Sequence, residues 1–111
     1  TNCYFEERDI IKNSVLFEYF DVMCMSCELG MKKPDTAIFE RCLKDLGLEA
    51  QECLYVGDGG SLELETAQAV GMHPLQAAWY LKDGTRQPAK RKAEFAQAES
   101  PMDVTRRPFF I

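Results

Sequence analysis

The sequence predicts an α/β fold built on a parallel sheet. Short apolar runs, which are typical of buried strands, alternate along the chain with segments whose apolar residues recur at helical spacing. Gly and Pro residues mark the connections between these segments. Such alternation is typical of βαβ units, in which a helix joins two neighbouring parallel strands.

Apolar periodicity assigns each segment in turn. The predicted strands lie at residues 21–27, 53–56 and 73–81, with a last short strand at 93–98. The predicted helices lie at residues 5–13, 36–46 and 62–70. We expect residues 15–20 to extend the first helix or to form a turn, and residues 101–111 to be a terminal segment.

Residues at the ends of the second and third predicted helices support both assignments. Asp35 precedes the second helix, where its carboxylate is suited to cap free N–H groups, and Gly47 follows the last helical residue. Ser61 and Gly71 stand in the corresponding places around the third helix. We therefore expect both helices to begin and end at these residues.

Composition limits the function classes. A chain of 111 residues suffices for one hydrophobic core, so we expect a single α/β domain over residues 1–111. The net charge of −5 argues against nucleic acid as a partner, and no apolar run is long enough to cross a membrane. The five cysteines are an odd number among mostly apolar neighbours, which favours reduced thiols and a cytoplasmic protein. Residues 82–92 are predicted to be a solvated, basic surface loop.

Charged side chains follow the predicted strands. Asp58 comes two residues after Val56, and Lys33 follows the strand that ends near Ser26. Pro34 disfavours the helical region for the residue before it, so we expect Lys33 to lie in the loop. Because the carboxyl ends of parallel strands share one edge of the sheet, we expect these two charged groups to converge on one crevice.

The side chains expected at this edge suit a phosphate and a hard cation. Mg²⁺ commonly takes one or two carboxylates together with waters and substrate phosphate, and a lysine binds phosphate as a point charge. Gly57, Gly59 and Gly60 allow a tight turn whose N–H groups face an anion. The hydroxyl of Thr1 joins the same edge if that residue ends a strand.

These residues carry a resemblance to a known family. The segments SCELGMKKPDTAIFERCLKDLG and ECLYVGDGGSLELETAQAVGM, at residues 26–47 and 52–72, resemble the C-terminal half of a haloacid dehalogenase-like hydrolase of the phosphatase type. A looser similarity covers residues 1–21. The resemblance implies a Rossmann-like core, here a partial doubly wound parallel sheet without its N-terminal strand and cap.

The resemblance also implies roles for individual residues. Thr1 and Asn2 match the strand-end motif that binds phosphate, and Lys33 matches the catalytic lysine before proline that balances the charge of nucleophile and phosphate. Asp58 matches the first of two acids that hold Mg²⁺. Glu63 stands at the second, where Asp is commoner, so its contact with the metal is expected to be longer or through water.

The family's nucleophile motif is absent from these residues. No Asp-x-Asp occurs in the chain, although the leading Asp of that motif attacks phosphorus in the family. The resemblance therefore implies a fragment of a longer Mg²⁺-dependent phosphatase, which hydrolyses a small phosphate ester through an aspartyl-phosphate. We expect the fragment to be inactive alone. The dehalogenase and phosphonatase branches share much of the core and stay open.

Simpler interpretations apply to several of these residues. Asp58 is also a common turn residue after a strand, and Glu63 complements the dipole at a helix start, as Glu65 does. The segment GDGGSL partly resembles a dinucleotide-binding loop but lacks its third Gly. Cys24 and Cys27 supply only two of the four ligands of a structural zinc site.

A second function class is compatible with the same residues. The chain would then be a noncatalytic binding or assembly module derived from the fold. An exposed edge of its truncated sheet would pair with a partner or with a second copy, because unpaired strand edges recruit strands.

Overall fold

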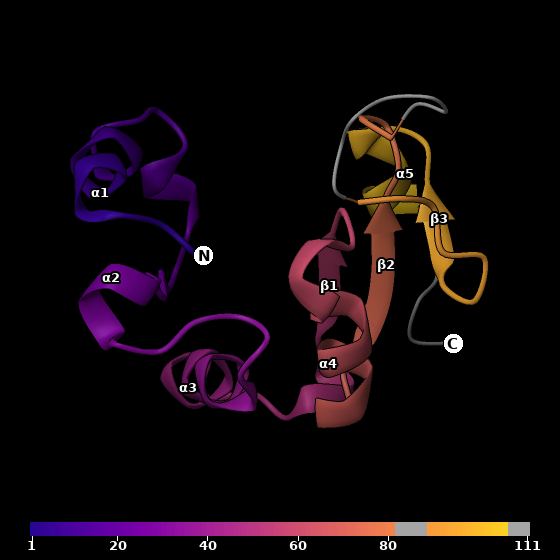
Figure 1. The fold of residues 1–111 in the computed structure, drawn as a ribbon, viewed down its shortest axis with the longest axis horizontal. Coiled ribbons are helices and arrows are strands. Elements are labelled where there is room, and N and C mark those ends of the chain that lie inside the picture. Colours follow the sequence, from indigo (N-terminus) through magenta and orange to yellow (C-terminus); the bar gives the residue numbers. More distant parts are fainter. Residues whose placement is uncertain (82–88, 107–111) are drawn as a thin grey trace. The chain divides into compact units, whose positions relative to one another are not determined.

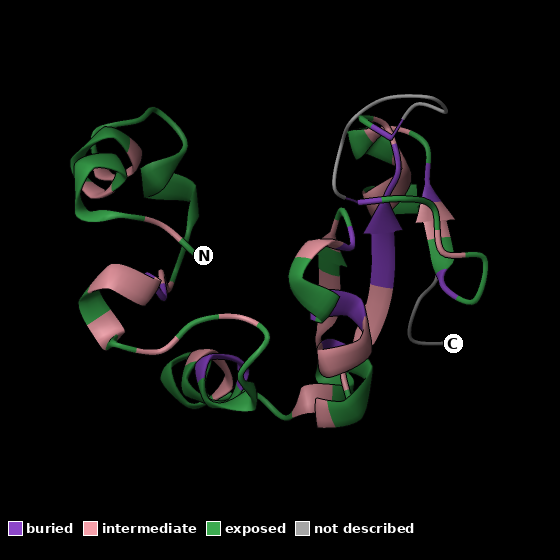
Figure 2. Cartoon of the chain, viewed as in Figure 1, coloured by how far each residue is buried: buried purple, intermediate pink, exposed green. Residues whose placement is uncertain are grey.

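The computed structural model describes residues 1–81 and 89–106. Contacts divide the chain into two compact units, the N-terminal unit Thr1–Leu48 and the C-terminal unit Glu49–Ile111. Each has its own secondary structure (Figure 1) and its own buried side chains (Figure 2). The single domain over residues 1–111 stays a prediction.

The N-terminal unit is helical. Its helices are α1 (Phe5–Lys12), α2 (Ser26–Leu29) and α3 (Thr36–Leu46), with a 3-10 turn η1 (Phe17–Tyr19) after α1. Helix α3 has the predicted bounds. Asp35 precedes it in an extended conformation, although no side-chain cap bond forms, and Gly47 ends it in the left-handed region with φ of 68°.

The prediction of a strand at residues 21–27 is wrong. The described residues of the N-terminal unit contain no strand, and helix α2 begins within the predicted run. Cys24 and Met25 are buried, so the apolar run reports burial rather than sheet pairing. Only Thr1 lies alongside: its amino group donates to the carbonyl of Cys24, and the N–H of Ser26 donates to the carbonyl of Thr1 at 2.9 Å. In these two bonds Thr1 pairs with the backbone on either side of Met25, as a residue in a parallel sheet does. Pairing at a single residue is too short to form a strand.

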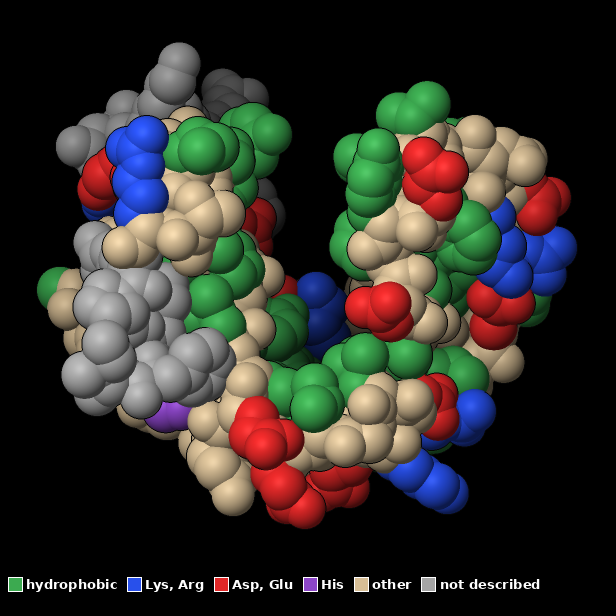
Figure 3. All heavy atoms as spheres, turned by 180° about the vertical axis from the view of Figure 1, so that it is seen from behind, with side chains coloured by type: hydrophobic (Ala, Val, Ile, Leu, Met, Phe, Trp, Pro, Cys, Tyr) green, Lys and Arg blue, Asp and Glu red, His purple; other side chains and the backbone are tan. Residues whose placement is uncertain are grey.

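Apolar side chains of the N-terminal unit reach the surface. Large exposed ones include Tyr4, Phe5, Ile10, Val15, Leu16, Tyr19 and Phe20. Figure 3 shows hydrophobic side chains interspersed with charged ones over the molecular surface. Exposed large apolar side chains thus occur in α1 and in residues 15–20 that follow it.

The C-terminal unit carries the sheet. Its strands are β1 (Leu54–Gly57), β2 (His73–Ala77) and β3 (Ala96–Ala98), all parallel in the order β1-β2-β3. Its helices are α4 (Glu63–Val70) and α5 (Pro101–Arg106), and 3-10 turns η2 (Ala50–Glu52) and η3 (Gly60–Leu62) precede β1 and α4. The predicted α/β class with a parallel sheet is confirmed.

Several element bounds differ from the sequence prediction. β2 ends at Ala77 rather than at residue 81, and β3 keeps only the end of the predicted last strand. Residues 101–106 of the predicted terminal segment form α5, and residues 107–111 lie outside the described residues. The predicted loop at residues 82–92 lies outside the described residues at 82–88.

The core of the C-terminal unit lies between α4 and the sheet. Leu64 and Ala67, one helical turn apart on α4, are fully buried, as are Leu75 on β2 and Ala98 on β3. Helix α4 packs against β1 and β2 (Figure 1). Burial of a leucine side chain contributes about 1.5–3 kcal/mol, so these residues hold the helix and its preceding loop against the sheet. Among the described residues, no helix is both long enough and apolar enough for a bilayer.

Candidate functional site

The loop between β1 and α4 carries the predicted acids. The carboxylate of Asp58 is exposed, and its Oδ1 accepts a hydrogen bond of 2.9 Å from the N–H of Gly60. Gly59 has φ of 99°, a conformation that L side chains rarely adopt. Glycine at this position therefore lets the chain turn sharply directly after the exposed acid.

Helix α4 begins without the expected serine cap. Ser61 and Leu62 have positive φ values of 54° and 51° within and after the turn η3, and α4 begins at Glu63. Leu62, not Ser61, occupies the position before the helix. A turn with positive φ at Gly59, Ser61 and Leu62 thus replaces the capped start that the sequence predicts.

The carboxylate of Glu63 lies buried against the end of β1. Only 4% of Glu63 is exposed. Its Oε1 accepts a hydrogen bond of 3.0 Å from the N–H of Gly59, and its Oε2 accepts one of 2.8 Å from the hydroxyl of Tyr55. A Cβ at Gly57 would overlap Oε1, so glycine there leaves room for the acid. The structure therefore brings Asp58 and Glu63 to one loop, the first exposed and the second buried.

Tyr55 keeps its proton in this environment. Burial is the main cause that raises the pKa of its hydroxyl far above the ordinary value, and the hydrogen bond to Glu63 raises it further. Tyr55 is consequently a hydrogen-bond donor to Glu63 throughout the physiological pH range. Sequence reasoning missed this residue because a tyrosine in an apolar run gives no sign of its partner.

The other acid near this loop has a structural role. Glu65 forms an ion pair with Lys92. Within residues 1–81 and 89–106 there is no group of at least three His, Cys, Asp or Glu side chains arranged to hold a metal ion. A cation at Asp58 would therefore take most of its ligands from water and phosphate, as Mg²⁺ commonly does.

The predicted phosphate-binding residues lie together in the N-terminal unit. The side-chain amide of Asn2 accepts a hydrogen bond of 2.8 Å from the N–H of Lys33 and donates one of 3.0 Å to its carbonyl. Lys33 lies in the loop before α3, as the following proline predicts, and the Lys33–Pro34 peptide bond is cis. Burial first, and then the charge of Lys33, lowers the pKa of the Thr1 amino group. The structure thus brings Thr1, Asn2 and Lys33 together.

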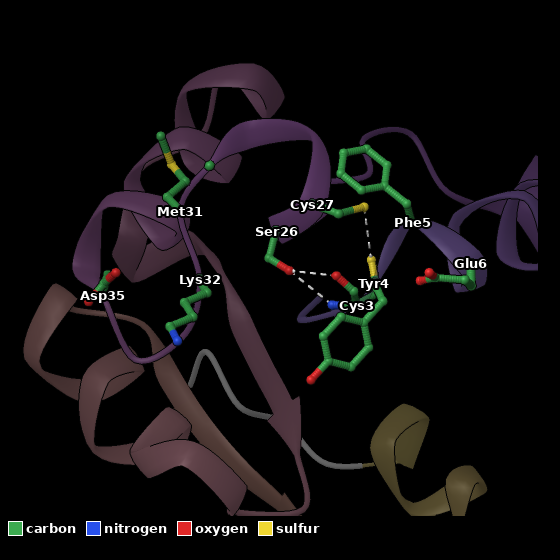
Figure 4. Close-up of a pocket in the computed structure, with 10 residues that line it drawn as sticks. Cys3, Tyr4, Phe5, Glu6, Ser26, Cys27, Met31, Lys32 and Asp35 are labelled. Atoms are coloured by element: carbon green, nitrogen blue, oxygen red, sulfur yellow. Dashed lines mark hydrogen bonds between the residues drawn. The ribbon is translucent and has the colours of Figure 1, made fainter.

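A cavity of about 520 Å³ lies in the same unit (Figure 4). Its lining includes Cys3, Tyr4 and Phe5 from the N-terminal segment, Ser26 and Cys27 from α2, and Lys32. The sulfur atoms of Cys3 and Cys27 are 3.6 Å apart, and Ser26 Oγ bonds to both the N–H and the carbonyl of Cys3 at 2.9 and 3.1 Å. Cys27 therefore has Cys3 as its sulfur neighbour, not the Cys24 of the sequence motif, and all five cysteines are free thiols.

Comparison with known proteins identifies the family. The model of the haloacid dehalogenase-like hydrolases matches residues 6–77, more than half of the chain. The chain belongs to the haloacid dehalogenase-like hydrolase family. The matched part of this family member contains Lys33, Asp58 and Glu63, whereas Thr1 and Asn2 precede it.

Phosphatases are among the similar proteins. A glyceraldehyde 3-phosphate phosphatase from Methanocaldococcus jannaschii is 39% identical over 54 residues, which are 49% of this chain and 24% of that protein. The rhythmically expressed gene 2 protein from Drosophila melanogaster is 33% identical over 67 residues, which are 58% of this chain and 26% of that protein. This haloacid dehalogenase-like hydrolase chain thus spans about a quarter of the length of these relatives.

Solved structures of the family share the fold. A HAD phosphatase from Thermococcus onnurineus has a TM-score of 0.73 and 24% identity over 93% of this chain and 45% of its own. A 2-haloacid dehalogenase from Pseudomonas syringae pv. Tomato DC3000 has a TM-score of 0.65 and 26% identity over 86% of this chain and 42% of its own. The Rossmann-like α/β core of the family is therefore present here.

Proposed function

We propose that this chain is the metal- and phosphate-binding part of a hydrolase that acts on a small phosphate ester. The observation that carries the proposal is the loop Gly57–Glu63, in which an exposed carboxylate follows a parallel strand and a second, buried carboxylate braces the turn. The phosphatases among the similar proteins support the same reaction class.

In this proposal Mg²⁺ is the cofactor and Asp58 is its protein ligand. The donor set fits, because an exposed carboxylate oxygen is a hard ligand of the kind that Mg²⁺ prefers. Bound Mg²⁺ would offset the negative charge that gathers on the phosphate oxygens during transfer. Both oxygens of Glu63 already accept hydrogen bonds, so Glu63 holds the loop that carries Asp58.

Lys33 supplies the complementary charge to the phosphate. Its ammonium binds phosphate oxygens and stabilises the negative charge that develops on them. Asn2 holds both backbone polar groups of Lys33, so it positions the lysine as well as standing next to Thr1 in the phosphate-binding motif. Thr1 contributes a hydroxyl donor to the same group.

The covalent step requires an aspartate from outside these 111 residues. In the parent protein an Asp carboxylate oxygen would attack phosphorus and form an acyl phosphate, while the ester P–O bond breaks and the leaving oxygen takes a proton. Water would then hydrolyse the acyl phosphate and release inorganic phosphate. Because the chain contains no Asp-x-Asp, we propose that it turns over no substrate alone.

Metal titration and an activity assay of the 111-residue chain test these statements. We expect Mn²⁺, a spectroscopically visible substitute for Mg²⁺, to bind the wild-type chain and to bind Asp58→Asn at least about ten-fold more weakly. Asp9→Asn removes the same charge from an exposed helical site and should bind as the wild type does. Equal affinity in both variants would refute the role of Asp58. Substantial Mg²⁺-dependent hydrolysis of para-nitrophenyl phosphate by the chain would refute its proposed inactivity.

A noncatalytic assembly role is the second candidate. Among the described residues, β1 pairs only with β2 and is therefore an edge strand, and the N-terminal unit exposes many aromatic and aliphatic side chains. Such features favour self-association. A light-scattering mass that is twice the 12.7 kDa chain mass at micromolar concentration supports pairing with a second copy, and a monomer excludes that form of the candidate. The free thiols favour a reducing, cytoplasmic location.

A further inference from the structure

Gln76 is a fully buried polar residue in the centre of the sheet. It lies on β2, and its register partners are Gly57 at the end of β1 and Gln97 on β3. None of its surface is exposed. Strands that are buried in parallel sheets are normally continuous runs of apolar residues, so a glutamine here requires an explanation.

Both hydrogen-bond donors and both acceptor sites of the Gln76 side-chain amide have a partner. Nε2 donates to the carbonyls of Asp58 and Lys90, both at 2.8 Å. Oε1 accepts from the N–H of Lys92 at 2.8 Å and from Nε2 of Gln97 at 2.7 Å. A buried amide with both donors and both acceptor sites satisfied holds its partners in one arrangement.

The loop after β1 is shaped to receive this amide. A Cβ at Gly59 would lie 2.8 Å from Nε2 of Gln76. Glycine at position 59 therefore permits the close approach as well as the positive φ of the turn. Gln76 donates a hydrogen bond to the carbonyl of Asp58, and Glu63 accepts one from the N–H of the next residue, Gly59. Two side chains therefore fix the backbone that carries the exposed carboxylate of Asp58.

We propose that Gln76 is the positioning residue of the metal ligand Asp58. It holds the carbonyl of Asp58, which sets the direction of the carboxylate before any cation binds, and it joins that loop to the backbone at Lys90 and Lys92. This inference rests on the proposed function for the metal role of Asp58. A purely structural role would connect β2 with the segment 90–92 and leave the order of the Asp58 loop unaffected.

Two matched variants separate these roles. Gln76→Met keeps the length of the side chain and removes its bonds to Asp58, whereas Gln97→Met removes a neighbouring amide that contacts Gln76 but not the loop. Hydrogen exchange at the Gly59 and Gly60 amides reports loop order, and Mn²⁺ titration reports the readiness of Asp58 to bind metal. Gln76→Glu is the second variant if Gln76→Met does not fold, because it keeps the shape and one acceptor oxygen while losing the amide donors.

We expect Gln76→Met to speed exchange at both glycine amides and to weaken Mn²⁺ binding about ten-fold, as the loss of one well-placed hydrogen bond predicts. Gln97→Met should change the Mn²⁺ affinity by less than about two-fold. Unchanged glycine exchange in the Gln76 variant, or equal effects of the Gln76 and Gln97 variants, overturns the inference. If the wild-type chain binds no Mn²⁺ while exchange rises only in the Gln76 variant, Gln76 still positions the loop and the metal role proposed for Asp58 is wrong.

Discussion

The hydroxyl of Tyr55 donates a hydrogen bond of 2.8 Å to the buried carboxylate of Glu63. Oε2 of Glu63 thus binds a side chain of β1, and Oε1 accepts a hydrogen bond from the N–H of Gly59 in the following turn. Strand, turn and helix start are therefore linked through a single acid, and the consequences can be measured.

Removal of the Tyr55 hydroxyl should destabilise the chain. Tyr55→Phe removes the hydrogen bond from the Tyr55 hydroxyl to the buried carboxyl group of Glu63, which we expect to lower the free energy of unfolding by about 1–3 kcal/mol in urea denaturation. Tyr80→Phe is the matched control, because Tyr80 is exposed and should change stability by less than about 0.5 kcal/mol. Equal stability of the two variants would contradict the assignment.

Alkaline pH should weaken the fold through the same residue. Burial and the bond to Glu63 raise the pKa of Tyr55 in the folded chain, so above the unfolded value of about 10 the unfolded chain loses a proton that the folded chain keeps. The folded state then binds more protons, and stability falls as pH rises. Thermal unfolding between about pH 9 and 11 should show a steeper loss in the wild type than in Tyr55→Phe. Parallel curves would remove Tyr55 as the cause.

The Asn2 side chain should matter for anion binding. Asn2→Ala removes two hydrogen bonds to the backbone of Lys33, and we expect it to weaken binding of inorganic phosphate about three- to ten-fold, measured by ³¹P NMR titration. Asn13→Ala is the control, since Asn13 ends α1 in the same unit and has no contact with Lys33 among the hydrogen bonds of the described residues. If Asn13→Ala weakens phosphate binding as much, the effect belongs to the unit's stability and not to Lys33.

Cys27 should react as a thiol of raised pKa. Partial burial first, and then the hydrogen bond with Cys3, raises the pKa of Cys27 above the ordinary value. Because the thiolate is the reactive form, its iodoacetamide alkylation should be slower than that of glutathione at pH 8 and should keep rising with pH after the glutathione rate levels off. Mass spectrometry of the Cys27 peptide measures the rate. Cys3→Ala should speed the reaction at pH 8, and a slower reaction in that variant would contradict the role of Cys3.

The sequence predicted the bounds of an element correctly where residues adjacent to it in the chain set those bounds. Helix α3 has its predicted bounds, because an extended residue before it and a left-handed glycine after it are properties of neighbouring residues. The run at residues 21–27 was predicted wrongly, since an apolar run reports burial and does not say whether a neighbouring strand is available for pairing. Its buried residues, Cys24 and Met25, satisfy the same pattern without a sheet.

Some residues of the candidate site were predicted from sequence motifs, whereas others were found only in the structure. Motif matching predicts Lys33, Asp58 and Glu63 as site residues, and this stays a prediction, whereas Tyr55 and Gln76 gave no signal beyond polar groups inside apolar runs. A polar residue in a predicted buried strand implies that partners exist, because buried polar groups are nearly always hydrogen-bonded. It does not say which residues those partners are.

Sequence alone determined the α/β class, the family motifs and the ends of α3, because these depend on apolar periodicity and on the backbone preferences of adjacent residues. Tertiary structure alone decided that Asn2 binds Lys33 across 31 positions of the chain, and that Gln76 binds Asp58 across 18. The physical reason is range: a side chain's conformational preference acts on its neighbours in sequence, whereas its hydrogen-bond partners are chosen by whichever distant segments the fold brings within reach.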